Sequence, residues 1–404
     1  MKSVFFPLSK VDRTPLVQFN LVTHPKAILV KRYQLKEGLV TPLPGGTVPK
    51  GCQVSSYQMS LARYAQCLHA GGSSQYALPA NTTLGLQVPL VTKQLSKQLG
   101  LGIHRGKEHM YFVKGQPAVL TLDYDPSAHA LVSMSTPQHL WSLLVQCFPK
   151  VFSQAAHVGY YSSSSFIHYP DLSLYRGASG HHSAFAIADA GDIARFGEAL
   201  FQRLWLRGLG YMHITQAGTL LARTLFDKKV LQPQQPLFIG GAHCEDGLTQ
   251  RRPPPIIQAG TYIDSLQLPS LFPRELALYH KLIDDAKVKA EPLARCLREA
   301  YQQKEFRRLT ESGIDPHLAS TCVQARSGGT LIASDILHFA LMGTVSVAEV
   351  LAHPEKYHGC CLHDPMEPHY GSAQTAIFYA NSQQRNPIIF SHAHGGRKFN
   401  LVLA

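Results

Sequence analysis

The chain has 404 residues, of which 45% are hydrophobic, so it can bury a large core, and its length predicts two or three domains. Lys and Arg number 38 against 26 Asp and Glu, a formal net charge of +12. This excess favours polyanionic partners, nucleic acid first and an anionic membrane surface second. No apolar run approaches the ~18 residues of a membrane span, so we expect no membrane-spanning segment.

The cysteines indicate a reducing compartment. They are spaced irregularly and form no Cys-x-x-Cys pair, which argues against a secreted disulfide framework. The N-terminal cluster Val4-Phe5-Phe6 is too short for a signal-peptide core, and Pro7 interrupts it. We therefore expect a soluble protein of the cytoplasm. The eight cysteines are Cys52, Cys67, Cys147, Cys244, Cys296, Cys322, Cys360 and Cys361.

The first element that indicates chemistry is a strand that leads into two carboxylates. Residues 1–90 are weakly patterned, apart from a helix predicted over 60–68, and they yield no chemistry. Residues 108–114 are predicted as a strand, followed by a turn at Gly115. Residues 118–122 form the next predicted strand, which runs directly into Asp123-Tyr124-Asp125.

Asp123 and Asp125 should project from the same face of this strand, since side chains alternate across a strand. Pro126 ends the strand behind them. Two carboxylates this close repel each other unless a cation lies between them. A hard divalent ion such as Mg²⁺ or Mn²⁺ prefers such oxygen ligands. The plain alternative is a polar strand end, because a motif of three residues recurs by chance.

A helix and a Gly-containing turn follow. Thr136-Pro137 predicts a helix start, with a capping residue before Pro at the first helical position. Residues 177–180 are small and would let the backbone approach a ligand closely. His181 and His182 come next and precede a strand predicted over 183–188.

The third acidic candidate is Asp227. Asp192 predicts the start of a helix with an apolar stripe that ends at Gly208. Asp227 then follows the apolar pair Leu225-Phe226, where a third strand could end. A Pro-rich stretch at 251–255 is predicted as a stiff connector.

The character of the chain changes to helix near residue 273. Residues 275–309 are rich in Leu, Ala, Lys, Arg and Glu and contain little Gly. Ser346 and Glu349 form a capping box that predicts a further short helix. We therefore expect a main domain over 1–270, a helical domain over 271–355 and a C-terminal extension of unassigned role over 356–404.

Three features lie in a fixed order along the chain. They are the apolar run into Asp123-Tyr124-Asp125, a small-x-His unit (Ser179-Gly180-His181 or Gly180-His181-His182), and Asp227 after its apolar pair. In this the sequence resembles the archaeo-eukaryotic primase superfamily, specifically its phage- and plasmid-encoded primase-polymerase branch. The likeness covers about residues 85–275 and, less specifically, Asp364-Pro365 and 391–396.

The resemblance implies an α/β (α+β) fold, in which an RRM-like antiparallel catalytic sheet with an N-terminal α/β extension precedes a small helical domain. It implies a DNA primase-polymerase of a mobile element, which joins nucleoside triphosphates on a single-stranded DNA template in the cytoplasm of a bacterial host. Nucleotidyl transfer of this kind uses two Mg²⁺ or Mn²⁺ ions roughly 4 Å apart, which activate the attacking hydroxyl and steady the leaving oxygen.

The resemblance also implies roles for single residues. Asp123 and Asp125 would be shared metal ligands, and Asp227 would complete the second metal site. A His at the strand start would donate to the triphosphate. His182 is favoured over His181, since His182 is followed directly by the strand, but the double His leaves the choice open. A structural or solvent-facing position is the alternative for either ring.

Further polar residues are expected around these motifs. Ser179, Arg176 and Arg223 are candidates for nucleotide binding, since a guanidinium fork matches phosphate geometry. Arg251 and Arg252 are candidates for contacts with the template backbone. A solvated surface position is the alternative interpretation for each of these arginines.

Two departures from the family pattern matter. Residues 232–235 read Gln-Pro-Gln-Gln where relatives are expected to carry an acidic and then a basic residue. No Gly-x-x-x-x-Gly-Lys-Ser/Thr motif occurs, so a helicase motor would be absent or on another polypeptide. His358, Cys360, Cys361 and His363 are spaced too tightly to favour a structural zinc site.

Two other functions stay open from the sequence. One is a replication-initiator or DNA-binding module that keeps the fold with weak or no turnover. The other is a metal-dependent nuclease that uses the same carboxylates.

Overall fold

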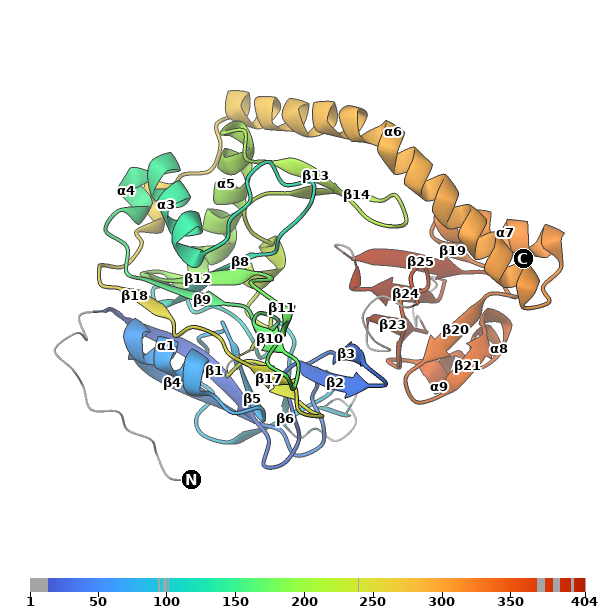
Figure 1. Ribbon diagram of the computed structural model, residues 1–404, viewed down its shortest axis with the longest axis horizontal. Coiled ribbons are helices and arrows are strands. Elements are labelled where there is room, and N and C mark those ends of the chain that lie inside the picture. Colours follow the sequence, from blue (N-terminus) through green and yellow to red (C-terminus); the bar gives the residue numbers. More distant parts are fainter. Residues whose placement is uncertain are drawn as a thin grey trace. The chain divides into compact units, whose positions relative to one another are not determined.

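A computed structural model describes residues 14–93, 95–96, 100, 102–238, 240–368, 375–380, 386–393 and 396–403 (Figure 1). The chain forms two compact units. The first unit comprises Met1–Tyr211 and Arg223–Leu282, and the second comprises Met212–Ala222 and Ile283–Ala404. Both units mix helices and strands, as the predicted α/β class requires. The first unit ends at Leu282, within the helix that begins at Pro273, and residues 356–404 belong to the second unit.

A ten-stranded mixed sheet organises the described part of the first unit. Its strands are β1 (Leu16–Thr23), β4 (Gln53–Ser60), β5 (Gln75–Leu78), β6 (Val88–Val91), β7 (Ile103–His104), β8 (Ala118–Tyr124), β9 (His157–Tyr161), β12 (His181–Ile187), β15 (Leu237–Phe238) and β18 (Ile256–Gln258). The main path runs β18-β9-β12-β8-β1-β4-β6-β7, and β5 pairs with β1 and β15. β12 is antiparallel to both β8 and β9, whereas β8 and β1 are parallel.

Shorter elements complete the first unit. Two small sheets consist of β2 (Arg32–Lys36), β3 (Leu39–Leu43) and β16 (His243–Cys244), and of β10 (Ile167–His168), β11 (Leu174–Arg176) and β17 (Thr249–Gln250). Its described helices include α1 (Leu61–Ala70), α3 (Pro137–Cys147), α4 (Pro149–Phe152) and α5 (Ile193–Leu206), with 3₁₀ turns η1 (Ala190–Asp192), η2 (Lys228–Leu231) and η3 (Ser265–Gln267).

Local signals explain where several helices begin and end. The Thr136 hydroxyl accepts a hydrogen bond from the His139 amide and caps α3, which confirms the predicted start at Pro137. Ser60 caps α1 in the same way. Gly208, with φ of +74°, follows the end of α5, because a residue without Cβ adopts the left-handed conformation at low cost.

The two faces of the sheet are buried by different helices. Ala184 and Ala186 on β12 pack with Tyr64 of α1 in one apolar cluster. Phe185, which points to the other face, packs on Phe152, whose ring centroid lies 5.2 Å away. Figure 1 shows α3, α4 and α5 on that second side of β8, β12 and β9. This alternation fixes which β8 and β12 side chains can meet.

Two predicted strands are wrong. Residues 108–114 form turns, in which Met110 donates to the Gly106 carbonyl and the Glu108 carboxylate pairs with Lys93 and His104. Residues 225–226 also lie outside any strand, because the preceding strand already ends at Arg223 and Asp227 caps the next turn.

The second unit contains a seven-stranded sheet in the order β19-β25-β24-β23-β22-β20-β21. The segment predicted as a helical domain therefore also supplies strands. The elements are α6 (Pro273–Glu311, which begins in the first unit), α7 (Pro316–Ser327), α8 (Val347–Ala352), α9 (Pro354–Tyr357), β19 (Thr330–Leu331), β20 (Ile336–Phe339), β21 (Gly343–Ser346), β22 (Cys361–Leu362), β23 (Ala376–Tyr379), β24 (Ile388–Ser391) and β25 (Arg397–Leu401).

Predicted helices of this unit are confirmed. The stretch 275–309 lies within α6, and the Ser346 hydroxyl accepts from the Glu349 amide at the start of α8. Arg326 forms two buried ion pairs: it lies 2.6 Å from Asp335 and 3.3 Å from Glu305. Leaving either charge alone would be costly, because a buried charge needs its partner.

A hairpin of β13 (Tyr211–Ile214) and β14 (Leu220–Arg223) belongs to the second unit, apart from its end residues Tyr211 and Arg223. The Ala217 amide donates to Glu367 at 3.1 Å, and the Arg298 guanidinium donates to the Gly218 carbonyl at 3.0 Å. Gly218 has φ of +70°, and a Cβ there would lie 2.4 Å from the Ala294 carbonyl oxygen. Only glycine lets the tip lie this close to α6.

All eight cysteines are free thiols. In the part of the chain that is described, no helix is both long and apolar enough to cross a lipid bilayer.

Candidate active site

Asp123 and His182 lie side by side on neighbouring strands. The register of β8 and β12 pairs the two residues directly, on the sheet face that α1 covers. His182 Nε2 lies 3.2 Å from Asp123 Oδ1, but without the alignment of a hydrogen bond. Among the described residues, Asp123 Oδ1 and His182 Nδ1 are buried with no hydrogen-bond partner. A buried carboxylate oxygen in this state is a ready acceptor for a cation or a donor from a ligand.

His181 lies on the opposite face of the sheet. Its ring stacks on Tyr124, with centroids 4.8 Å apart, and only 1% of its surface is exposed. Neither ring nitrogen makes a well-aligned hydrogen bond within the described residues, and burial lowers the pKa of His181 to about 4. The structure thus brings His182 to the carboxylates and gives His181 a packing role.

Asp227 reaches the same strand end. Its backbone N–H donates to the Asp123 carbonyl at 3.0 Å. Its Oδ2 lies 2.9 Å from Arg223 Nη1, and its Oδ1 accepts from the Lys229 amide at 3.0 Å. The carboxylate is therefore close to Asp123 but neutralised by Arg223, so a cation could use it only if Arg223 turned away.

Asp125 lies just beyond the end of β8, against Gly180. A Cβ at Gly180 would lie 3.0 Å from the Tyr124 carbonyl oxygen and 3.2 Å from Asp125 Oδ1. The surrounding protein, and then repulsion from Asp123, raise the pKa of Asp125 to about 6. Its side chain is exposed, so screening by water reduces this shift.

The electrostatics of the site favour an added cation. Burial raises the pKa of Asp123 to about 7; the charge of Lys31 lowers this pKa, and a smaller repulsion from Asp227 raises it. Burial also lowers the pKa of His182 to about 4, and Lys31 and Arg252 contribute to this decrease. At neutral pH His182 is therefore uncharged and Asp123 only partly ionised, so an added positive charge beside Asp123 would favour its ionised form.

Asp123→Asn is expected to stabilise the protein at pH 8. Folding raises the pKa of this carboxyl, so its ionisation lowers the free energy of unfolding. This loss is absent below about pH 4, grows with pH, and is complete above about pH 7. Removing it should raise the free energy of unfolding by on the order of 3 kcal/mol at pH 8. Urea unfolding at pH 8 and pH 4.5 measures this gain, which should nearly vanish at the lower pH.

Asp171→Asn is the matched control. This exposed carboxylate accepts from the Ser173 amide and hydroxyl, which lower its pKa. Because folding lowers the pKa of Asp171, ionisation of this carboxylate stabilises the folded state, so the variant should lose a little stability at pH 8. Equal unfolding free energies for wild type and Asp123→Asn at both pH values would contradict the assignment.

Sequence reasoning missed the basic residue Lys31 beside the carboxylates. Lys31 Nζ donates to Ser164 Oγ at 3.0 Å, and its charge acts on Asp123, Asp125 and His182. The same serine loop holds Ser179, whose amide donates to Ser165 Oγ at 3.1 Å. No local pattern could have assigned Lys31, because it reaches the site only through the fold.

The predicted arginines lie in different surroundings. Arg252 is largely enclosed and donates to the carbonyls of Tyr161 and Leu68. Its charge acts on His182. Arg176 and Arg251 are exposed, and Arg223 holds Asp227.

Asp123 and Asp125 are hard oxygen donors that suit Mg²⁺ or Mn²⁺, and the unpartnered Asp123 Oδ1 fits such an ion. Over the ranges that the structure describes, no three His, Cys, Asp or Glu side chains are grouped as metal ligands. This includes His358, Cys360, Cys361 and His363, where His358 Nδ1 accepts from the Ala380 amide. Asp227 is the residue whose ion pair would have to open.

No protein-family model matches the chain, and neither a curated protein nor a solved structure matches it significantly. Function must therefore be inferred from the geometry of the site.

Proposed function

We propose that this chain is a metal-dependent DNA primase-polymerase of a mobile element, which joins nucleoside triphosphates on single-stranded DNA. The observation that carries the proposal is the meeting of Asp123 on β8, His182 on β12 and Asp227, which caps η2, at one strand end. The antiparallel β8-β12-β9 arrangement is compatible with an RRM-like catalytic sheet. The net charge of +12 suits a nucleic-acid template.

Each residue has a chemical task in this proposal. Asp123 and Asp125 would hold the divalent ions, which supply charge stabilisation at the attacking and leaving oxygens. His182 and Lys31 would donate to the triphosphate, where a fixed donor in an enclosed site stabilises the charge that develops. Arg223, once released from Asp227, would be free to pair with a phosphate.

The ion pair between Arg223 and Asp227 favours a second candidate. With the third carboxylate occupied at 2.9 Å, the chain could bind DNA as a replication-initiator module with weak or no turnover. Either function would belong in a bacterial cytoplasm, and unwinding of duplex DNA would need a separate helicase.

The test uses the intact chain on circular single-stranded DNA with Mn²⁺ or Mg²⁺ and labelled nucleotides. Labelled products that require template, nucleoside triphosphates and metal, and that disappear with a chelator, are the expected result. Ribonucleotide and deoxyribonucleotide arms identify the preferred sugar.

Two other outcomes would replace the proposal. Tight DNA binding that weakens steeply with salt, without incorporation, would indicate the initiator module. Loss of template without added nucleotides would indicate a nuclease that uses the same carboxylates.

A further inference from the structure

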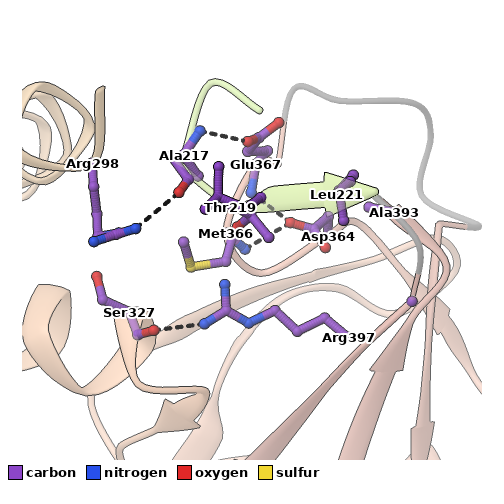
Figure 2. Close-up of a pocket in the computed structure, with 13 residues that line it drawn as sticks. Ala217, Thr219, Leu221, Arg298, Ser327, Asp364, Met366, Glu367, Ala393 and Arg397 are labelled. Carbon is purple, nitrogen blue, oxygen red and sulfur yellow. Dashed lines mark hydrogen bonds between the residues drawn. The ribbon is translucent and has the colours of Figure 1, made fainter. Parts of the chain in front are cut away.

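A cavity of about 440 Å³ lies within the second unit (Figure 2). The hairpin tip forms one side of it, and α6, the end of α7, the loop after β22 and the start of β25 form the others. Prominent lining residues are Ala217, Arg298, Ser327, Asp364, Met366 and Arg397. The cavity includes parts of two segments that the sequence singled out, at Asp364 and at 391–396, of which residues 394 and 395 lie outside the described residues.

Asp364 presents one carboxylate oxygen to this cavity. The residue is only 3% exposed. Its Oδ1 accepts from the amides of Met366 and Glu367, at 2.9 and 2.6 Å, as Figure 2 shows. Its Oδ2 makes no hydrogen bond within the described chain, yet it is not sealed from solvent. A nearly buried carboxylate with one free oxygen is a strong acceptor for a ligand's N–H groups.

Arg397 presents a complementary donor edge. Its guanidinium lies over the Phe399 ring, 5.2 Å from the centroid, and Nη2 donates to the Ser327 carbonyl at 2.6 Å. Nε and Nη1 make no hydrogen bond in the described ranges, and Nη2 carries a second N–H, so one two-donor edge of the guanidinium stays available to a ligand. The charges of Asp364 and Arg397 attract each other. Both side chains line the same cavity, so the carboxylate acceptor and the guanidinium donors can contact one ligand.

The remaining walls are largely apolar. Leu220, Leu221, Met366 and Ala393 supply apolar lining. The other charged residues of the lining, Glu367 and Arg298, bond to the backbone of the hairpin tip. Such a site suits a flat molecule that carries N–H donors on one edge, acceptors on the next, and an apolar face. The base guanine has this pattern, with N1–H and the exocyclic amine for a carboxylate and with O6 and N7 for an arginine.

We propose that this cavity binds a guanine base, with Asp364 accepting from N1–H and the exocyclic amine, and Arg397 donating to O6 and N7. The choice of a nucleobase as the ligand rests on the proposed nucleotidyl-transfer function. The pattern of hydrogen-bond donors and acceptors in the cavity is independent of that function. The site is separate from the carboxylates at β8 and belongs to the second unit alone.

The test is equilibrium binding to the full chain by calorimetry, with a chelator present so that metal-dependent binding is absent. Guanosine monophosphate should bind, inosine monophosphate about tenfold more weakly because it lacks the exocyclic amine, and adenosine monophosphate more weakly still. A thymidine oligonucleotide with one dG, compared with an all-thymidine strand, shows whether the base comes from a strand or from a free nucleotide.

Asp364→Asn isolates the proposed contact. Asn Oδ1 can still accept from both backbone amides, and only the ligand-facing acceptor becomes a donor, so guanine binding should weaken at least about tenfold with little change in melting temperature.

Asp315→Asn is the matched control, because Asp315 Oδ1 also accepts from two amides, His317 and Leu318, but at the start of α7. Equal binding of the three nucleotides, or equal effects of the two variants, would overturn the proposal. Guanine binding without nucleotide incorporation would retain this site and reject the proposed enzyme.

Discussion

The double variant Asp123→Asn/Asp125→Asn is expected to lower nucleotide incorporation by at least about 10³-fold. Asp123 Oδ1 is buried with no hydrogen-bond partner in the described chain, and Asp125 lies at the end of the same strand. An amide of the same shape keeps the packing but removes both negative charges, and a neutral amide is a poor ligand for a hard cation. Steady-state primer extension on single-stranded DNA with Mn²⁺ measures the loss.

The variant should remain folded, because ionised Asp123 destabilises the native state when no cation is bound. Melting curves with and without Mn²⁺ give an independent readout. Wild type should gain stability on addition of the ion, whereas the double variant should not. Asp171→Asn, on an exposed turn, should keep both activity and the response to Mn²⁺. Undiminished incorporation by the double variant would end the polymerase proposal.

His182→Ala is expected to lower the turnover rate of incorporation by about 10²- to 10³-fold. The ring lies on the carboxylate face, with Nε2 3.2 Å from Asp123, and its low pKa keeps it neutral before the substrate arrives. A triphosphate in the site would supply negative charge that favours donation from the imidazole. Single-turnover rates and nucleotide KM measured separately show whether the loss lies in chemistry or in binding.

His181→Phe is the partner variant on the same strand. The ring of His181 stacks on Tyr124 and makes no well-aligned hydrogen bond within the described residues. Phe can fill this space without leaving a buried nitrogen unsatisfied, so activity should stay within about threefold and stability should not fall. The reverse pattern, with His181 essential and His182 dispensable, would show that the opposite face of the sheet carries the chemistry.

Local signals in the sequence predicted much of the secondary structure. Thr136-Pro137 and Ser346 marked helix starts because a capping side chain acts on an amide three residues away. The strand over 118–122 was legible from its β-branched and apolar residues, and in the structure it extends to Tyr124. The turns over 108–114 could not be predicted in this way, since they depend on contacts of Glu108 with Lys93 and His104.

The candidate site could be predicted only in part. Side-chain alternation placed Asp123 and Asp125 together, and the strand that follows the double His favoured His182, which the structure pairs with Asp123. The occupation of Asp227 by Arg223 was not legible, because an ion pair depends on side-chain direction. Lys31 was missed because it reaches the site from a segment distant in sequence, and no local sequence pattern indicates that it lies near Asp123.

The hairpin of β13 and β14 has a consequence for how the protein is made. Its tip packs with residues that come later in the chain, through Glu367, Arg298 and the close approach of Gly218 to α6. Because a ribosome releases the N-terminal part first, the hairpin emerges long before these partners exist. A nascent chain that ends after Leu282 would therefore carry this hairpin without its packing surface, and the second unit, to which Met212–Ala222 belongs, can be completed only when the later residues arrive.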